Sequence, residues 1–167
     1  MSMLIRLAKI EDLVQIVEIY NQAIPSKKST GDTVLLKIEE KIDWFNNHTP
    51  EKYPIYVAEI EEIIVGWISI SPYRDGRGAF DHTAEVSYYV DNKHYRKGIA
   101  GKLLSYATEQ CLVLKINTLT AYIMEHNTAS IRLMDKFGFE RWALLPKIAN
   151  FEGKEFNHTI YGKRVVS

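Results

Sequence analysis

Cysteine is almost absent from this chain of 167 residues, which contains only Cys111. One cysteine can form neither an intramolecular disulfide nor a cysteine-based zinc site, so both are excluded as sources of stability. A charge excess is missing as well, because 21 Lys and Arg residues balance 21 Asp and Glu residues. A protein held to nucleic acid mainly by phosphate contacts normally carries a basic excess, and we therefore set nucleic acid aside as a partner.

Long apolar runs are also missing. No stretch approaches the roughly 20 apolar residues that a membrane-spanning helix needs. The first residues, MSMLIRL, contain no basic segment followed by a long apolar one, so we expect no signal peptide, no membrane contact and a cytoplasmic location. No linker, repeat or low-complexity tract divides the sequence. Residues 1–167 are predicted to form a single domain with one substantial core.

The first half of the chain is predicted to form a strand, two helices and a hairpin. Apolar residues at helical or alternating spacing place these elements at Met3–Leu7, Ile10–Ile24, Val34–Asn47, Ile55–Ala58 and Ile63–Ser71. Lys27–Thr33 lies between the two helices and is expected to be a loop. Tyr73–His82 is rich in glycine, arginine and aspartate, and we expect it to be an exposed loop.

The second half adds two helices and four strands. Strands are expected at Glu85–Val90, Leu119–Met124, Phe139–Leu145 and Phe156–Val165, with a turn region at Pro146–Glu155. Gly98–Leu114 is predicted to be a helix, and a further helix is expected between an N-cap at Asn127 and a C-cap at Gly138. This order predicts an α/β protein with a mixed, mostly antiparallel sheet of about six to seven strands flanked by about four helices.

A candidate anion site lies where the strand of residues 85–90 leads through a short loop into the following helix. Small residues in the first helical turn, Gly98, Ala100 and Gly101, leave backbone N–H groups open, and the helix dipole favours an anion there. Arg96 and Lys97 add positive charge. The pattern predicts a pyrophosphate site, with plain turn chemistry as the alternative. The spacings of a P-loop and of a dinucleotide-binding motif are absent.

Two motifs resemble those of the GNAT family of N-acetyltransferases. Gly98-x-Ala100 is similar to the family signature Q/R-x-x-G-x-G/A, with Tyr95 in place of the usual Gln or Arg. Asn127–Phe139, NTASIRLMDKFGF, resembles the family pattern N-x-x-S-I-x-L-Y-x-K-x-G-F. The resemblance covers essentially the whole chain. It implies a single-domain GNAT fold with acetyl-CoA as co-substrate and no metal.

The resemblance also implies which residues bind acetyl-CoA. Backbone groups of the strand would contact the pantetheine arm, and the helix start would hold the pyrophosphate. Asn127 would both cap its helix and reach the pantetheine. The implied cofactor-binding residues are Tyr88, Tyr89, Val90, Arg96, Lys97, Gly98, Ile99, Ala100, Gly101, Asn127 and Lys136. For Lys136, a solvated helix position is the alternative.

A narrower likeness connects the chain with phosphinothricin and methionine-sulfoximine acetyltransferases. It rests on residues 83–90, TAEVSYYV, and on the loop that follows Pro72. It implies that Glu85 is the general base, since an amine must be neutral to attack a thioester and a carboxylate can take its proton. A half-exposed strand glutamate without a catalytic role is the alternative. It also implies a homodimer and a small, amino-acid-like acceptor amine. The implied substrate-binding residues are Arg74, Arg77, Phe80 and Thr83, because a guanidinium can bind a carboxylate or phosphinate bidentately. An ordinary basic loop is the alternative.

The proton donor for the leaving thiolate stays open. Met134 stands where many family members have a Tyr, and Met cannot donate a proton; Tyr122, water or unassisted departure are the alternatives. Cys111 repeats with the apolar face of its helix and is expected in the core rather than as an acyl carrier. The histidines show no metal-ligand spacing. Two other functions stay open: an acetyltransferase for protein N-termini or polyamines, and a non-catalytic CoA-binding sensor.

Overall fold

The computed structural model describes residues 2–166 and contains one seven-stranded sheet in the order β1-β2-β3-β4-β5-β7-β6. The strands are β1 (Leu4–Leu7), β2 (Ile55–Ile60), β3 (Ile63–Pro72), β4 (Thr83–Val90), β5 (Thr118–Met124), β6 (Glu140–Phe151) and β7 (Lys154–Arg164). All neighbouring strands are antiparallel except β4 and β5, which are parallel. The predicted mixed, mostly antiparallel sheet and the predicted order of elements are confirmed.

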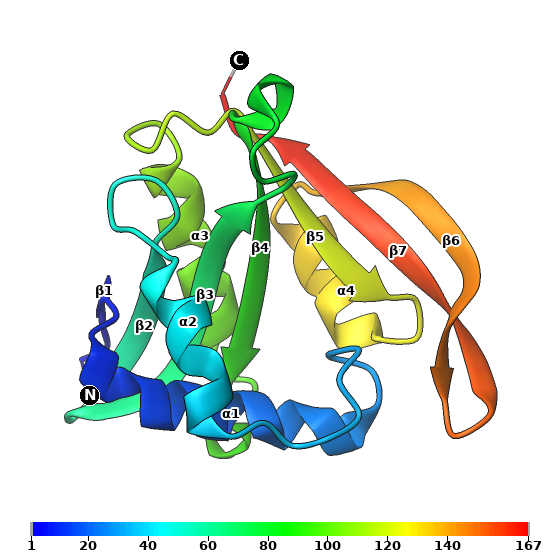
Figure 1. Ribbon diagram of the computed structural model, residues 1–167, viewed down its shortest axis with the longest axis horizontal. Coiled ribbons are helices and arrows are strands. Elements are labelled where there is room, and N and C mark those ends of the chain that lie inside the picture. Colours follow the sequence, from blue (N-terminus) through cyan, green and yellow to red (C-terminus); the bar gives the residue numbers. More distant parts are fainter. Residues whose placement is uncertain (1, 167) are drawn as a thin grey trace.

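Helices cover both sides of the sheet (Figure 1). They are α1 (Leu13–Ala23), α2 (Ile42–Asn46), α3 (Ile99–Gln110) and α4 (Thr128–Lys136). In Figure 1, α1 and α2 lie in front of the sheet, and α3 and α4 lie behind it. We call these two sides of the sheet the α1 face and the α3 face.

Each face has its own apolar core. On the α3 face, Leu103 and Met134 are fully buried together with strand residues such as Ile68. On the α1 face, Ile16 packs with Trp67, whose indole N–H donates a hydrogen bond of 3.1 Å to the Ile16 carbonyl. Because neighbouring residues of a strand point to opposite faces, the central strands supply side chains to both cores.

The sheet divides between β4 and β5. Their parallel pairing includes only Thr83–Glu85 against Thr118–Thr120, after which the two strands separate, as Figure 1 shows. β5 instead stays paired with β7 along its whole length. Residues 86–90 of β4 therefore have a strand partner on the β3 side only, and the other edge keeps backbone groups that the sheet does not use.

The predicted helix Val34–Asn47 is wrong in its first part. Residues 34–37 are not helical, and helical structure begins with a 3-10 turn at Ile38 that continues into α2. The Asn21 side chain forms two hydrogen bonds of 2.9 Å with the backbone of Leu36, one with its N–H and one with its carbonyl. These bonds replace helical ones. Local periodicity cannot reveal them, since Asn21 belongs to a different helix.

The predicted turn Pro146–Glu155 is also wrong. β6 continues as far as Phe151, and the turn shrinks to residues 152–153. β6 is an edge strand, where a proline without an N–H is tolerated, and a register shift in the β6–β7 pairing accommodates Pro146. An edge position depends on the strand order, which the local sequence does not contain.

Candidate active site

α3 starts with a backbone turn that is open to a ligand. Two residues with left-handed backbone, Arg96 (φ 63°) and Gly98 (φ 75°), lead the chain from the end of β4 into the helix. A Cβ added at Gly98 would meet nothing within 4 Å, so a ligand can approach the N–H groups of the first helical turn. Arg96 and Lys97 are exposed beside it. The helix start therefore combines open space, N–H donors and positive charge.

Gly101 has a different role from Gly98. It is buried, and an added Cβ would lie 2.9 Å from Cζ of Phe137, which follows α4. The glycine therefore allows α3 and α4 to approach each other, which the sequence pattern did not indicate. α3 itself ends at Gln110, before the predicted end at Leu114.

A cavity of about 890 Å³ lies where β4 and β5 separate. Its lining includes Glu85 and all of residues 86–90 of β4. Consecutive strand residues point to opposite faces, so a cavity lined by all of them reaches both faces of the sheet. Glu85 and Tyr89 belong to the α1 face, whereas Tyr88 belongs to the α3 face, where the start of α3 also lines the cavity.

Glu85 is the one carboxylate among the described residues that line this cavity. It is half-buried, and burial raises its pKa above the ordinary value for a glutamate, which strengthens it as a base. Tyr122 of β5 and His158 of β7 line the same cavity, with ring centroids 5.6 Å apart. Burial lowers the pKa of His158, so its imidazole is neutral at neutral pH. Sequence reasoning missed His158, because only the pairing of β7 with β5 brings it to the cavity.

Tyr88 carries a buried hydroxyl group that has no hydrogen-bond partner among the described residues. Burial raises the pKa of Tyr88 to about 12, and the side chain of Ser130 in the first turn of α4, which lies beside the hydroxyl without forming a well-aligned hydrogen bond, acts in the opposite direction. A buried hydroxyl without a partner is unfavourable by roughly 1–3 kcal/mol.

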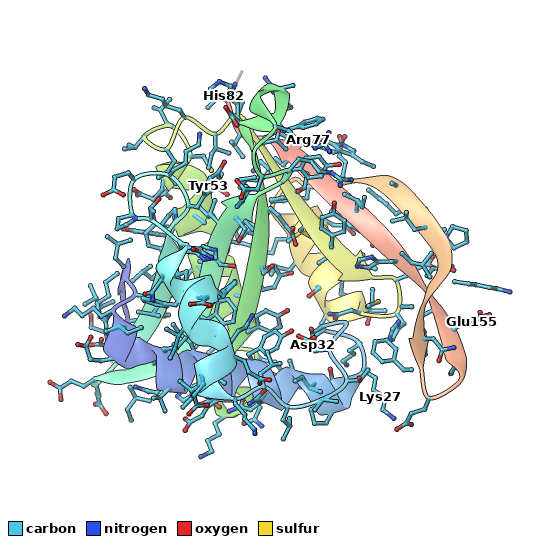
Figure 2. All side chains as sticks on the ribbon, viewed as in Figure 1. Lys27, Asp32, Tyr53, Arg77, His82 and Glu155 are labelled. Atoms are coloured by element: carbon cyan, nitrogen blue, oxygen red, sulfur yellow. The ribbon has the colours of Figure 1, made fainter. Side chains whose placement is uncertain are left out.

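The loop between α1 and α2 closes one end of the cavity. We call residues 27–31 the strap, of which residues 28–31 line the cavity. The strap is fixed by bonds to its backbone carbonyls: His126 Nε2 binds Lys27 O at 2.7 Å, Asn127 Nδ2 donates to Lys28 O at 3.3 Å, and the Tyr89 hydroxyl donates to Ser29 O at 3.2 Å. Figure 2 labels Lys27, the first residue of the strap, and Asp32, which directly follows it. The sequence predicted a loop here but not its attachment, since His126 and Asn127 lie 99 residues from their partners.

Asn127 has the capping role predicted for it. Its Oδ1 accepts a hydrogen bond from Ser130 N at 3.3 Å, and α4 begins at the next residue. At the other end of α4, Gly138 adopts a left-handed backbone with φ 77°, as expected of a residue that closes a helix. The cap thus fixes the start of α4 beside the cavity.

Most of the residues predicted to bind acetyl-CoA meet at the cavity. The lining includes Tyr88, Tyr89, Val90, Arg96, Gly98, Ile99, Ala100, Gly101 and Asn127. Lys136 lies instead in a second hollow of about 660 Å³, which shares Gly98 and Gly101 with the cavity. Lys97 is exposed on the loop before α3 and is part of neither lining.

The predicted substrate residues lie outside the cavity lining: Arg74, Arg77, Phe80 and Thr83. Arg77 is exposed in the loop between β3 and β4, at the top of the molecule in Figure 2. The Arg74 guanidinium lies over the Tyr73 ring, 5.5 Å from its centroid, and the Tyr73 and Phe80 ring centroids are 5.5 Å apart. Burial raises the pKa of Tyr122, and the charge of Arg74 acts in the opposite direction.

Cys111 is fully buried in the α3-face core, as predicted, and burial raises the pKa of its thiol to about 12. Between residues 2 and 166, no group of three or more His, Cys, Asp or Glu side chains could hold a metal ion. In the same range, no helix is long and apolar enough to cross a membrane.

Comparisons with known proteins agree with this geometry. Residues 13–139 match the sequence model of the acetyltransferase (GNAT) family. A Bacillus subtilis relative, provisionally named a phosphinothricin acetyltransferase, is 40% identical over 98% of this chain and 99% of its own. The L-methionine sulfoximine/L-methionine sulfone acetyltransferase of Salmonella typhimurium is 31% identical over 87% of this chain and 85% of its own. The solved structure of a phosphinothricin acetyltransferase from Sinorhizobium meliloti in complex with acetyl-CoA has a TM-score of 0.92 and 26% identity, covering 99% of this chain and 90% of that one.

Proposed function

This chain belongs to the acetyltransferase (GNAT) family, and we propose that it acetylates the primary amine of a small, amino-acid-like compound, with Glu85 as the general base. It is an acyltransferase, and acetyl-CoA is its acetyl donor. The observation that carries the proposal is the cavity between β4 and β5. This cavity joins the helix start on the α3 face, which is open to an anion, to the half-buried carboxylate of Glu85 on the α1 face. A thioester between the two strands would thus be held from one side and attacked from the other.

The donor side offers groups that fit acetyl-CoA. The pyrophosphate would accept hydrogen bonds from the first turn of α3 at Gly98, Ile99 and Ala100, beside Arg96 and Lys97. The pantetheine arm carries amide groups, and the unused edge of residues 86–90 would bind them as it would bind an added strand. One N–H of the Asn127 amide also remains for the arm, because the other donates to Lys28 O. Lys136, in the second hollow, would bind the nucleotide end.

The acceptor side supplies the base. An ammonium ion has no lone pair, so Glu85 would take the amine proton as the nitrogen attacks the thioester carbonyl carbon. The raised pKa of this carboxyl suits it to that task. The wall formed by Tyr122, His158 and residues 28–31 of the strap is polar but uncharged apart from Lys28, which suits the polar side chain of an amino acid. Arg74, whose charge acts on Tyr122 of this wall, would bind the acceptor carboxylate, with Arg77, Phe80 and Thr83 shaping the entrance.

The test is thiol release from acetyl-CoA with a panel of amines. The panel contains methionine sulfoximine, methionine sulfone, phosphinothricin, a polyamine and a peptide with a free N-terminus. We expect release with the amino-acid-like compounds. In Glu85→Gln, turnover should fall on the order of 100-fold or more while the Kd for acetyl-CoA stays unchanged. Glu62→Gln, in the exposed β2–β3 turn, is the matched control.

Three outcomes would contradict parts of the proposal. Wild-type turnover in Glu85→Gln would exclude Glu85 as the base. Preference for the peptide or the polyamine would replace the proposed acceptor class. Tight CoA binding without thiol release from any amine would favour a non-catalytic sensor. For substrate recognition, Arg74→Ala should raise the KM for the amine and leave the KM for acetyl-CoA unchanged.

A homodimer and a cytoplasmic location stay predictions. Support for pairing comes from the edge strand β6, where Trp142, Leu144 and Ile148 are exposed apolar side chains. Sedimentation of the purified protein checks the first prediction, and cell fractionation checks the second.

A further inference from the structure

A base that takes the amine proton must release it again before the next turnover. Glu85 is half-buried in the cavity lining, and no ion pair within residues 2–166 includes it. When acetyl-CoA and the amine fill the cavity, they exclude water from this carboxyl group. A path of hydrogen-bonded side chains that leaves Glu85 away from the cavity would release the proton while the cavity is still occupied.

Ser71 of β3 lies directly across from Glu85. The β3–β4 register pairs these two residues, and paired residues of antiparallel strands point to the same face with Cβ atoms about 4.5–5.5 Å apart. That face is the α1 face, because Trp67 of the α1-face core lies four residues before Ser71 on the same strand. The Ser71 hydroxyl is therefore within reach of the Glu85 carboxyl group.

His48, two residues after α2, continues the path. Its Nε2 is 2.9 Å from Ser71 Oγ, and its Nδ1 is 2.7 Å from the carbonyl oxygen of Trp44. Because a carbonyl oxygen only accepts, Nδ1 carries the hydrogen, and Nε2 of the neutral ring accepts the hydrogen of the Ser71 hydroxyl. Burial lowers the pKa of His48, against the effect of the bond to Trp44, so the ring is neutral at neutral pH. The ring thus presents a free base to Ser71.

We propose that Ser71 and His48 are positioning residues that act through Glu85 and carry the amine proton away from it, an inference that rests on the proposed function and extends it. The O–H bond of protonated Glu85 breaks as its proton passes to Ser71 Oγ, and the former hydroxyl proton of Ser71 passes to Nε2 of His48. Glu85 is then a carboxylate again, Ser71 is unchanged and His48 is an imidazolium. Solvent takes the additional proton from His48, so protons balance over the cycle.

The surroundings of His48 suit a proton that is held for a short time. Burial raises the pKa of Glu85 and lowers that of His48, which draws the proton affinities of the two groups toward each other. The centroid of the Trp44 ring is 4.9 Å from that of the imidazole, and an aromatic ring at this distance stabilises a cation. The charge of Lys41 opposes the imidazolium, whereas the restored Glu85 carboxylate favours it. His48 is half-buried, so its ring keeps contact with water.

The first experiment compares His48→Gln with His82→Gln. Both histidines have Nδ1 2.7 Å from a backbone carbonyl oxygen, but His82 is exposed and outside the cavity lining. A glutamine can still bond to Ser71, yet it exchanges no proton at neutral pH. We expect kcat of His48→Gln to fall roughly 10- to 100-fold, with the KM for the amine and the Kd for acetyl-CoA unchanged. His82→Gln should keep wild-type kinetics, and circular dichroism checks that both variants fold.

A second pair of variants tests the path without touching the bond to Trp44. Ser71→Ala removes the hydroxyl group and should lower kcat as much as His48→Gln does, whereas Ser71→Thr keeps a hydroxyl group and should retain activity. The two losses should not add in the double variant, because either change interrupts the same path.

Imidazole added to His48→Ala supplies a readout that a structural role would not give. The free base should restore kcat in proportion to its concentration, with less rescue at pH values where imidazole is protonated. Wild-type kcat in His48→Gln or Ser71→Ala would overturn the inference and leave Glu85 as the base. A loss of kcat that imidazole does not restore would make His48 a structural residue and would overturn it as well. A wild-type protein that acetylates no amine would overturn both this inference and the proposed function.

Discussion

Gly101→Ala is expected to destabilise the protein, although alanine is the better helix former. An alanine gains about 1 kcal/mol over glycine within a helix. Its Cβ, however, would lie 2.9 Å and 3.1 Å from Cζ and Cε2 of Phe137. Overpacking of this kind costs about 1–3 kcal/mol, so the net loss should be about 1 kcal/mol. For a domain of this size, that lowers Tm by roughly 2–4 °C.

A double-mutant cycle with Phe137→Leu separates the two effects. Without the aromatic ring, the added methyl group has room, and only the gain in helix propensity remains. Gly101→Ala should therefore stabilise the Phe137→Leu background and destabilise the wild type, with a coupling energy of at least about 1 kcal/mol. Urea unfolding followed by circular dichroism measures all four proteins. Gly78→Ala, with no side-chain or backbone atom closer than Asp81 Oδ2 at 3.8 Å, is the control.

The sign of the change in unfolding free energy tests whether the Phe137 ring explains the glycine at position 101. If Gly101→Ala stabilises the wild type, Phe137 yields without cost, and the close approach of α3 and α4 does not explain the glycine. If the variant is destabilised equally in both backgrounds, the clash is not with the Phe137 ring.

Three further predictions concern titration and reactivity. Burial raises the pKa of Glu85, so log kcat/KM for the amine should fall with slope one below the pKa of the amine and with slope two below the pKa of Glu85. Glu85→Gln should keep slope one throughout, and a second break in the pH profile of that variant would contradict the assignment of Glu85 as the base. Burial acts to raise the pKa of Asp12, but bonds from Arg6 at 2.7 Å and 3.0 Å and from Lys9 N outweigh it and hold this pKa below the ordinary value. Because the pKa is lowered on folding, Asp12 stabilises the fold above about pH 4, and the contribution is lost as pH falls through the folded pKa. Asp12→Asn should therefore lose about 2 kcal/mol at pH 7 and less at pH 3 in urea unfolding, and an equal loss at both would refute the ionic explanation. Cys111, buried and with a pKa raised to about 12, should react with a thiol reagent only after unfolding, which also keeps it out of the thiol-release assay.

Local sequence patterns were sufficient where structure depends on neighbours along the chain. The caps at Asn127 and Gly138 and the open helix start at Gly98 were all readable, because each concerns a few consecutive residues. The strand pattern also placed Glu85 in a strand, and it lies in β4. The extended segment before α2 was not readable, since Asn21, in a different helix, holds it.

The sequence by itself determined the mixed α/β fold, the order of its elements and the family motifs at the start of α3 and at Asn127. The tertiary structure alone decided what surrounds the site. Tyr122 and His158 reach the cavity through the register of β5 and β7, and the strap reaches it through bonds to β5–α4 residues far along the chain. Spacing along the chain determines periodicity and caps, whereas the separation of β4 from β5 and the groups lining the gap depend on contacts between distant segments.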